Sequence, residues 1–305
     1  MSYLSSLLNA VPGIVSLGAI YGIMAIGVFI TFRILDFADL TVDGSFATGG
    51  AIFAILVYNG VSPIVGLLLA LVGGALAGLI TALLHCYLGI PGILAGILTQ
   101  LMLWSINVKI MGQANLPTGS RGALISLSSN ETAIPIILGI AAVIVALLYW
   151  FFGTKFGSSV RATGSNEAMS KANGININSR KIVALMISNA LVALAGALFA
   201  RYSGSADINQ GRGAIVVGLA AIVIGGAICR KLSNNFAVQL SFVLLGGFIY
   251  YFVYQAIALI PGVDTQLLKM FSSIIVAIFL AVPYVISHYI KPWKAKKARM
   301  NKEGI

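Results

Sequence analysis

Charged residues are scarce along the whole of this 305-residue chain. Only 9% of its residues are Asp, Glu, Lys or Arg, whereas a soluble domain carries about 25%. Hydrophobic residues make up 59% of the chain. This deficit of charge excludes a soluble globular protein and predicts a polytopic membrane protein, whose spanning segments are helices because lipid cannot satisfy open backbone groups. We therefore expect an all-α fold, with a single transmembrane domain at residues 1–290 and a basic tail at 291–305.

The residues that carry out catalysis or hold metal ions are also few. The cysteines Cys86 and Cys229 and the histidines His85 and His288 show neither metal-ligand spacing nor a disulfide framework. No P-loop pattern of the form Gly-x-x-x-x-Gly-Lys-Ser/Thr is present, so the chain does not bind ATP in that manner. We therefore expect no enzymatic activity and no cofactor bound by this chain. What is left is a translocation pathway whose energy comes from elsewhere.

Acidic residues are fewer than basic ones, which gives the chain a formal net charge of +11. The basic residues gather between Lys155 and Lys181 and in the tail from Lys291 onward. Basic segments beside apolar spans mark the cytoplasmic side of a membrane. We therefore expect a cytoplasmic C-terminus, contact with anionic membrane lipid and no nucleic acid partner. Phosphate binding by the tail is the weaker alternative.

Apolar blocks separated by short polar connections fill most of the sequence. Alternation of sides, starting from the two basic cytoplasmic segments, gives nine crossings and an external N-terminus. The second block is short for a crossing of about 20 residues, so the expected range is eight to ten. The blocks run over Ile14–Thr31, Ser45–Tyr58, Pro63–Leu84, Ile93–Met111, Ala133–Phe152, Ile182–Ala200, Gly213–Cys229, Phe236–Ile260 and Leu267–His288.

Two of these blocks contain the same short stretch. Gly49-Gly50-Ala51-Ile52 recurs as Gly225-Gly226-Ala227-Ile228. The two stretches lie in blocks that cross in opposite directions in the expected topology. This arrangement is typical of the inverted repeats of transporters, so we expect an inverted-repeat core.

The one long polar segment inside the chain, residues 153–181, predicts a short helix. Asn166 is a helix-capping residue, Glu167 places an acid in the first turn, and Gly174 suits the position just past the helix end. A helix of roughly three turns on one face of a membrane protein offers a surface for a partner. The alternative is a solvated loop helix that binds nothing.

Three acids, Asp36, Asp39 and Asp43, lie between the first two apolar blocks. Because acids are costly in lipid, their segment is either a short aqueous loop or irregular backbone facing a cavity within the protein. The acids depart from the positive-inside pattern, which favours the cavity. Asp43 has a second interpretation, as a cap that accepts hydrogen bonds from the first N–H groups of the next helix.

Further polar side chains lie within the apolar blocks. Gln100, Trp104 and Asn107 have the spacing i, i+4, i+7, which places them on one helix face. Such a face points to a pathway or to the bundle interior, or it forms interhelical hydrogen bonds that hold the bundle together. Asn189 has the same two interpretations. Tyr254, in an aromatic cluster of a later block, joins the candidate pathway.

The polar segment also carries a resemblance to a known family. Phe151–Ala168, continued by Ala172–Asn176, resembles the coupling-loop signature of ABC importer permeases, in the branch that serves branched-chain amino acids and monosaccharides. The early segment Arg33–Ser45 resembles a subgroup linked to aromatic amino acids such as tryptophan or tyrosine. Its acids Asp36 and Asp39 depart from the form usual in the sugar and branched-chain permeases.

This resemblance implies a permease subunit of an ABC importer in the bacterial plasma membrane. The expected partners are a second permease chain, forming a homodimer, two cytoplasmic ATPase subunits that bind the ATP, and an extracytoplasmic substrate-binding lipoprotein. The residues implied to couple the chain to the ATPases are Arg161, Gly164, Asn166, Glu167, Ala168, Lys171 and Gly174. The alternative is a self-sufficient carrier or channel in which Asp36, Asp39 and Asp43 bind a coupling cation.

Overall fold

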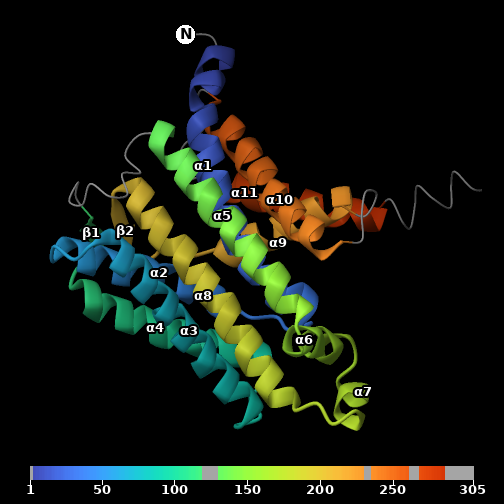
Figure 1. Cartoon of the computed structure of the whole chain (residues 1–305). Coiled ribbons are helices and arrows are strands. Elements are labelled where there is room, and N and C mark those ends of the chain that lie inside the picture. The colour runs from blue at the N-terminus through green and yellow to red at the C-terminus, as the bar shows by residue number, and fades with distance from the viewer. Residues whose placement is uncertain (1–2, 119–129, 230–234, 261–267, 286–305) are drawn as a thin grey trace, which may run out of the picture.

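A bundle of helices makes up almost the whole of this chain (Figure 1). The computed structural model describes residues 3–118, 130–229, 235–260 and 268–285. In chain order the elements are α1 (Tyr3–Phe29), the π-helix η1 (Ile30–Ile34), α2 (Thr41–Tyr58), α3 (Pro63–Cys86), α4 (Gly92–Met111), β1 (Asn115–Pro117), α5 (Asn130–Gly153), α6 (Lys155–Ser165), α7 (Glu167–Ala172), α8 (Ile177–Ser203), β2 (Ser205–Asp207), α9 (Ala214–Cys229), α10 (Phe236–Ala258) and α11 (Leu268–Val285).

The helical membrane fold predicted from composition is confirmed. Seven helical segments of the described chain are long and apolar enough to cross a membrane, and α9, with 16 residues, is shorter. The expected count of nine crossings is therefore not confirmed. The basic tail at 291–305, the C-terminus and the turn Arg230-Lys231 lie outside the described residues.

One small sheet interrupts the helices, and the sequence did not predict it. β1 and β2 pair antiparallel, with Asn115 opposite Asp207 and Pro117 opposite Ser205. Each strand has three residues and lies in a polar connection, so no alternating apolar pattern was available to reveal it. The pairing ties the connection after α4 to the connection after α8.

The centre of the bundle is α8, which packs against α1, α2 and α3 (Figure 1). Glycines allow these contacts to be close. A Cβ atom at Gly78 of α3 would collide with the carbonyl oxygen of Leu185, and one at Gly49 of α2 with that of Ala193. Small residues at such crossings are how membrane helices gain contact area when the surrounding lipid is as apolar as the helix surface.

The two ends of α8 define two ends of the molecule (Figure 1). Helices α6 and α7 immediately precede the start of α8, and α6 lies beside η1. The β1–β2 ribbon follows the end of α8. We call these the α7 end and the ribbon end.

Helices α2 and α9, which contain the repeated Gly-Gly-Ala-Ile stretch, begin next to each other. Residues 210–213 pass along α2, because a Cβ atom at Gly211 would collide with the carbonyl oxygen of Asp43, and Gln210 lies against Gly50. From there α9 leads away from α2, and its Gly218 lies against Val28 of α1. The starts of the two helices that contain the repeated stretch therefore lie together in the fold, and the inverted-repeat core stays a prediction.

Candidate functional site

The segment between η1 and α2 places its acids in different surroundings. Asp36 is exposed and has a φ of 54°, a conformation that side-chain-bearing residues rarely adopt. Asp39 is 2% exposed. Its carboxylate accepts hydrogen bonds from the backbone N–H of Thr41 at 2.9 Å and from the Asn189 side-chain amide at 2.7 Å. The segment is therefore irregular backbone packed within the protein at Asp39 and open at Asp36.

Asn189 of α8 joins this segment to the start of α2. Its side-chain oxygen accepts a hydrogen bond from Ser45 Oγ at 2.6 Å, and its Nδ2 group donates to Asp39 and to the Leu185 carbonyl. Asn189 is fully buried. Both groups of its amide are thus used inside the protein, which is the interhelical hydrogen bonding that was the alternative to a pathway role.

Asp43 caps a helix, although not its own. Its two carboxylate oxygens accept hydrogen bonds from the backbone N–H groups of Gly213 and Ile215, each at 2.9 Å. These are among the first N–H groups of α9, which have no partner within that helix. The negative charge also lies at the positive end of the α9 dipole. One of the two interpretations of Asp43 from the sequence was a cap, but on the helix that follows Asp43 in the chain.

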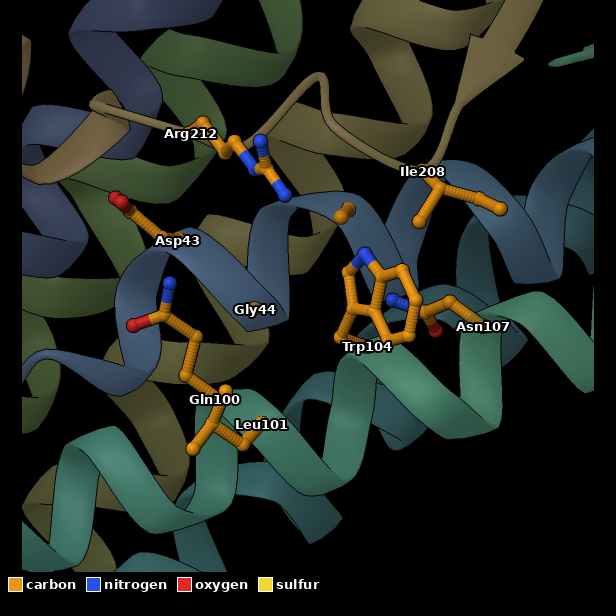
Figure 2. Close-up of a pocket in the computed structure, with 9 residues that line it drawn as sticks. Asp43, Gly44, Gln100, Leu101, Trp104, Asn107, Ile208 and Arg212 are labelled. Atoms are coloured by element: carbon orange, nitrogen blue, oxygen red, sulfur yellow. The ribbon is translucent and has the colours of Figure 1, made fainter. Parts of the chain in front are cut away.

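The polar face of α4 opens into a cavity that it shares with Asp43 (Figure 2). The cavity has a volume of about 140 Å³ and lies between α2, α4 and the connection before α9. We call it the α4 cavity. It is lined by Asp43, Gly44, Ala47, Gln100, Leu101, Trp104, Asn107, Ile208 and Arg212. The predicted stripe of Gln100, Trp104 and Asn107 therefore lines the same cavity as Asp43.

Asn107 does not serve as a link between helices. It is 1% exposed, and neither polar atom of its side chain has a hydrogen-bond partner among the described residues. Trp104, one turn earlier in α4, is 48% exposed. A buried amide without a partner costs free energy, so its place beside the cavity favours a pathway over a merely structural stripe.

A second cavity, of about 420 Å³, lies between α1, α8, α9, α10 and α11. We call it the tyrosine cavity. It is lined by Tyr21, Phe199, Asn209, Gln210, Arg212, Gly213, Ala214, Val216, Val217, Tyr250, Tyr251, Tyr254 and Ser273. Of the predicted pathway residues only Tyr254 lies here, and neither Asp39 nor Asn189 lines either cavity.

Arg212 lines both cavities, and sequence analysis missed it as a site residue. A signal was present, because Arg212 is a cation between two apolar blocks on the side that the positive-inside rule expects to be poor in basic residues. Tyr21 was also missed. It is a single tyrosine in an apolar block, and no local pattern distinguishes it from a packing residue.

The polar segment 153–181 contains two short helices where one was predicted. The predicted start and end of α7 are confirmed, since Asn166 Oδ1 accepts a hydrogen bond from the Met169 N–H at 2.9 Å and Gly174 has a φ of 75°. At six residues α7 is shorter than the expected three turns. The preceding helix α6 was missed because its sequence is rich in Gly and Ser, which favour other structures.

The residues implied to couple the chain to a partner fall into two groups. Asn166, Glu167, Ala168, Lys171 and Gly174 are exposed around α7. Arg161 and Gly164, both in α6, contact the body of the bundle instead. The Arg161 guanidinium donates to the Phe152 carbonyl at 2.7 Å. A Cβ atom at Gly164 would collide with the carbonyl oxygen of Ile34 in η1.

One ion pair links α7 to the bundle. Lys181 Nζ lies 2.6 Å from a carboxylate oxygen of Glu167, and also 3.4 Å from Nε2 of His85 at the end of α3. Glu167 is 53% exposed at its side chain, whereas Lys181 is 12% exposed. A movement of α7 would therefore be transmitted to α8 and α3 through these contacts.

Comparison with known proteins yields a family and several relatives. The family described as "Branched-chain amino acid transport system / permease component" matches residues 11–283. A tyrosine transport system permease protein of Clostridioides difficile (strain R20291) is 40% identical over 277 residues, which is 90% of this chain and 91% of that protein. A ribose import permease protein of Escherichia coli (strain K12) is 26% identical over 226 residues, or 72% of this chain and 70% of that protein.

Solved structures show the same fold. In the structure of PsaBC from Streptococcus pneumoniae in complex with Fab, one chain is similar to this one with a TM-score of 0.51 and 18% sequence identity. The similarity covers 96% of this chain and 93% of that chain.

Proposed function

The chain belongs to the family of branched-chain amino acid transport system permease components, and we propose that it forms one half of the solute pathway of an ABC importer. A second copy of the chain supplies the other half in the bacterial plasma membrane. Two ATPase subunits dock on the α7 end, which is then cytoplasmic, and a substrate-binding lipoprotein delivers the solute at the ribbon end. The covalent step, hydrolysis of ATP, occurs on the ATPase subunits.

The observation that carries this proposal is the construction of the α7 end. Helix α7 is capped at Asn166, its outer residues are exposed, and Met169 in its middle is 64% exposed. At the same time it is tied to the bundle through Glu167 and Lys181. A short helix that presents its surface outward and is fixed to the transmembrane helices behind it can transmit the movement of a docked partner.

The path from α7 into the bundle runs through α6 and η1. Gly164 of α6 lies against the backbone of Ile34 and Leu35. The chain then passes through Asp39, which is bonded to Asn189 of α8, and enters α2. A displacement of α6 therefore moves the start of α2 and, through Asp43, the start of α9. The start of α2 lines the α4 cavity, and the start of α9 lines the tyrosine cavity.

The placement of the acids supports the permease over the carrier. Asp39 is bonded to Thr41 and Asn189, Asp43 is bonded to the start of α9, and Asp36 is exposed. Within the described part of the chain no group of three His, Cys, Asp or Glu side chains could hold a metal ion. Acids that bind one coupling cation together would have to converge on it, and these three acids lie in different surroundings.

The solute that we propose is an amino acid, with an aromatic side chain favoured. The family description refers to amino acid transport, and the relative at 40% identity is a tyrosine transport system permease protein. The early motif around Asp36 and Asp39 supports the same choice.

The test is copurification of the chain with the ATPase encoded beside it, in mild detergent, for the wild type and Glu167→Lys. We expect the variant to bind the ATPase about thirtyfold more weakly or worse, as the loss of a charged interface contact of roughly 2 kcal/mol would produce. Because the Glu167 side chain is half exposed to solvent, the loss of its ion pair should cost only about 1 kcal/mol of stability, and the variant should remain folded.

A double variant separates docking from the internal ion pair. Glu167→Lys together with Lys181→Glu can re-form a pair of opposite charges while the altered charge stays on the docking surface. We expect the double variant to bind as weakly as the single one. Asp207→Lys, in β2 at the ribbon end, is the charge-reversal control and should bind normally. An ATPase complex unaffected by Glu167→Lys would refute docking at α7.

A further inference from the structure

Arg212 carries a charge that no described residue neutralises. Its side chain is exposed, and its guanidinium has no hydrogen-bond or ion-pair partner within the described part of the chain. In Figure 2 the side chain extends over α2 toward Trp104, and the Asp43 carboxylate points the other way. The carboxylate of Asp43 is used by the N–H groups of Gly213 and Ile215. Asp43, the one acid among the described residues that line the α4 cavity, is thus engaged with the start of α9.

None of the described residues that line the tyrosine cavity is an acid that could take this role. Arg212 is the one charged side chain among the described residues that line it. A guanidinium presents a planar set of donors that matches a carboxylate with two parallel hydrogen bonds. An unpaired guanidinium at the wall of a cavity therefore fits a ligand that brings its own carboxylate.

The rest of the cavity wall suits an aromatic ring. The rings of Tyr21 and Tyr251 are stacked, with centroids 5.6 Å apart and an interplanar angle of 19°, and Tyr254 continues the series at 5.6 Å from Tyr251. Such rings attract a further ring at separations of about 4.5–7 Å. Their faces also attract a cation such as an ammonium group. The volume of about 420 Å³ lies within the roughly 300–1,000 Å³ typical of small-molecule sites.

We propose that Arg212 binds the carboxylate of an aromatic amino acid whose ring occupies the tyrosine cavity, against Tyr21, Tyr251 and Tyr254. This proposal rests on the proposed function, since it assigns the recognition of the solute to named residues of the same pathway. Arg212 also lines the α4 cavity, so the carboxylate stays bound as the solute passes from one cavity to the other.

The test is direct binding of radiolabelled L-tyrosine to the full chain purified in detergent, with unlabelled competitors. In the wild type, L-tryptophan and L-phenylalanine should displace the label, and L-leucine should do so less well. Tyramine, which has the ring and the ammonium but no carboxylate, should bind about tenfold more weakly or worse, because a charge-assisted bidentate hydrogen bond is lost. This comparison needs no variant and so does not depend on whether a variant folds.

Two pairs of variants assign the effects to residues. Arg212→Gln should weaken the binding of L-tyrosine about tenfold or more and should abolish the preference for L-tyrosine over tyramine. Its control is Lys109→Gln, which removes an exposed cation of α4 that lines neither cavity. The control should change neither the affinity nor the preference. Tyr251→Leu should weaken the binding of L-tyrosine roughly two- to tenfold relative to the binding of L-leucine. Tyr149→Leu, on the exposed face of α5, is its control.

The outcomes distinguish this inference from the proposed function. Equal binding of L-tyrosine and tyramine, or an absence of L-tyrosine binding to the wild type, would overturn the inference. If ATP-driven uptake of a different solute by the reconstituted complex survives Arg212→Gln, the inference fails and the proposed function stands. A chain that never assembles with an ATPase would refute the proposed function, whatever it binds.

Discussion

Asn189 shows how a single side chain can hold an irregular segment inside a membrane protein. The NH₂ group of its side-chain amide donates a hydrogen bond to the Asp39 carboxylate, and the amide oxygen accepts one from the Ser45 hydroxyl. Nearby, Thr41, Thr81 and Thr99 form a chain of hydroxyl contacts at 2.7 and 2.9 Å that joins α2, α3 and α4. Buried polar groups are tolerated because almost every one has a partner here. Removing Asn189 would leave the Ser45 hydroxyl without its partner and one carboxylate oxygen of Asp39 without its hydrogen bond, while the Thr41 N–H still bonds the other oxygen.

We therefore predict that Asn189→Ala destabilises the chain by about 1–3 kcal/mol or more, the cost of leaving buried polar groups unsatisfied. The measurement is the midpoint of thermal unfolding in detergent. Asn178→Ala, in the first turn of the same helix, is the matched control, because that amide is exposed and makes only a 3.5 Å contact with the Cys86 carbonyl. Equal midpoints for the two variants would contradict the role given to Asn189.

At the same scale, the sequence predicted which polar side chains matter better than it predicted their partners. The i, i+4, i+7 spacing placed Gln100, Trp104 and Asn107 on one face, and that face does line a cavity. Spacing within one helix could not show that Asp43 caps α9, because the two are separated by 170 residues and meet only through the tertiary fold. Arg212 became a site residue for the same reason.

At the scale of the element, glycines set how closely α3 approaches the central helix α8. Gly78 and Gly74 of α3 lie against the carbonyl oxygens of Leu185 and Asn189. A methyl group at either place meets backbone, which cannot move aside as a flexible side chain can. Gly139 in the membrane helix α5 has nothing within 4 Å of its Cβ position. Glycine is therefore needed for close packing at positions 74 and 78 of α3, whereas position 139 of α5 has no such need.

Gly78→Ala should lower stability by about 1–3 kcal/mol through overpacking at the α3–α8 crossing. Gly139→Ala should be neutral or stabilising by up to about 1 kcal/mol, because alanine is the better helix former. Folded yield in detergent and the thermal midpoint measure both. A Gly139→Ala variant as damaged as Gly78→Ala would show that the loss comes from helix propensity or insertion and not from helix packing.

Apolar length predicted the helices well and their interruptions less well. The expected second block, Ser45–Tyr58, begins four residues after α2 does, because Thr41, Asp43 and Gly44 are polar or small, although Thr41 and Gly44 are buried and Asp43 is half-buried. Composition marks a residue as suited to lipid, whereas these residues are buried in protein. The π-helical turn of η1 and the β1–β2 ribbon depend on contacts between segments, so no local sequence pattern predicted them.

At the scale of the whole molecule, the proposed function requires a connection from α7 to the cavities. Such a connection exists as a series of contacts. Gly164 of α6 lies against η1, the following segment is bonded to Asn189 through Asp39, and Asp43 in the first turn of α2 holds the start of α9. Contacts of this kind carry coupling only if the elements move together, and the place to test this is the first contact of the series.

Gly164→Ala puts a methyl group where the Ile34 carbonyl lies, so α6 must move away from η1. In a complex reconstituted with its ATPase, we expect solute transported per ATP hydrolysed to fall between roughly twofold and thirtyfold, as changes of about 0.5–2 kcal/mol in coupling would give. ATPase binding should be retained, because Gly164 faces the bundle and the docking surface of α7 is unchanged. Gly153→Ala, at the end of α5 with nothing near its Cβ position, should leave the ratio at the wild-type value. If Gly164→Ala left the ratio unchanged, movement would have to pass from α7 through Lys181 to α8 and α3, and Lys181→Ala would then lower the ratio in its place.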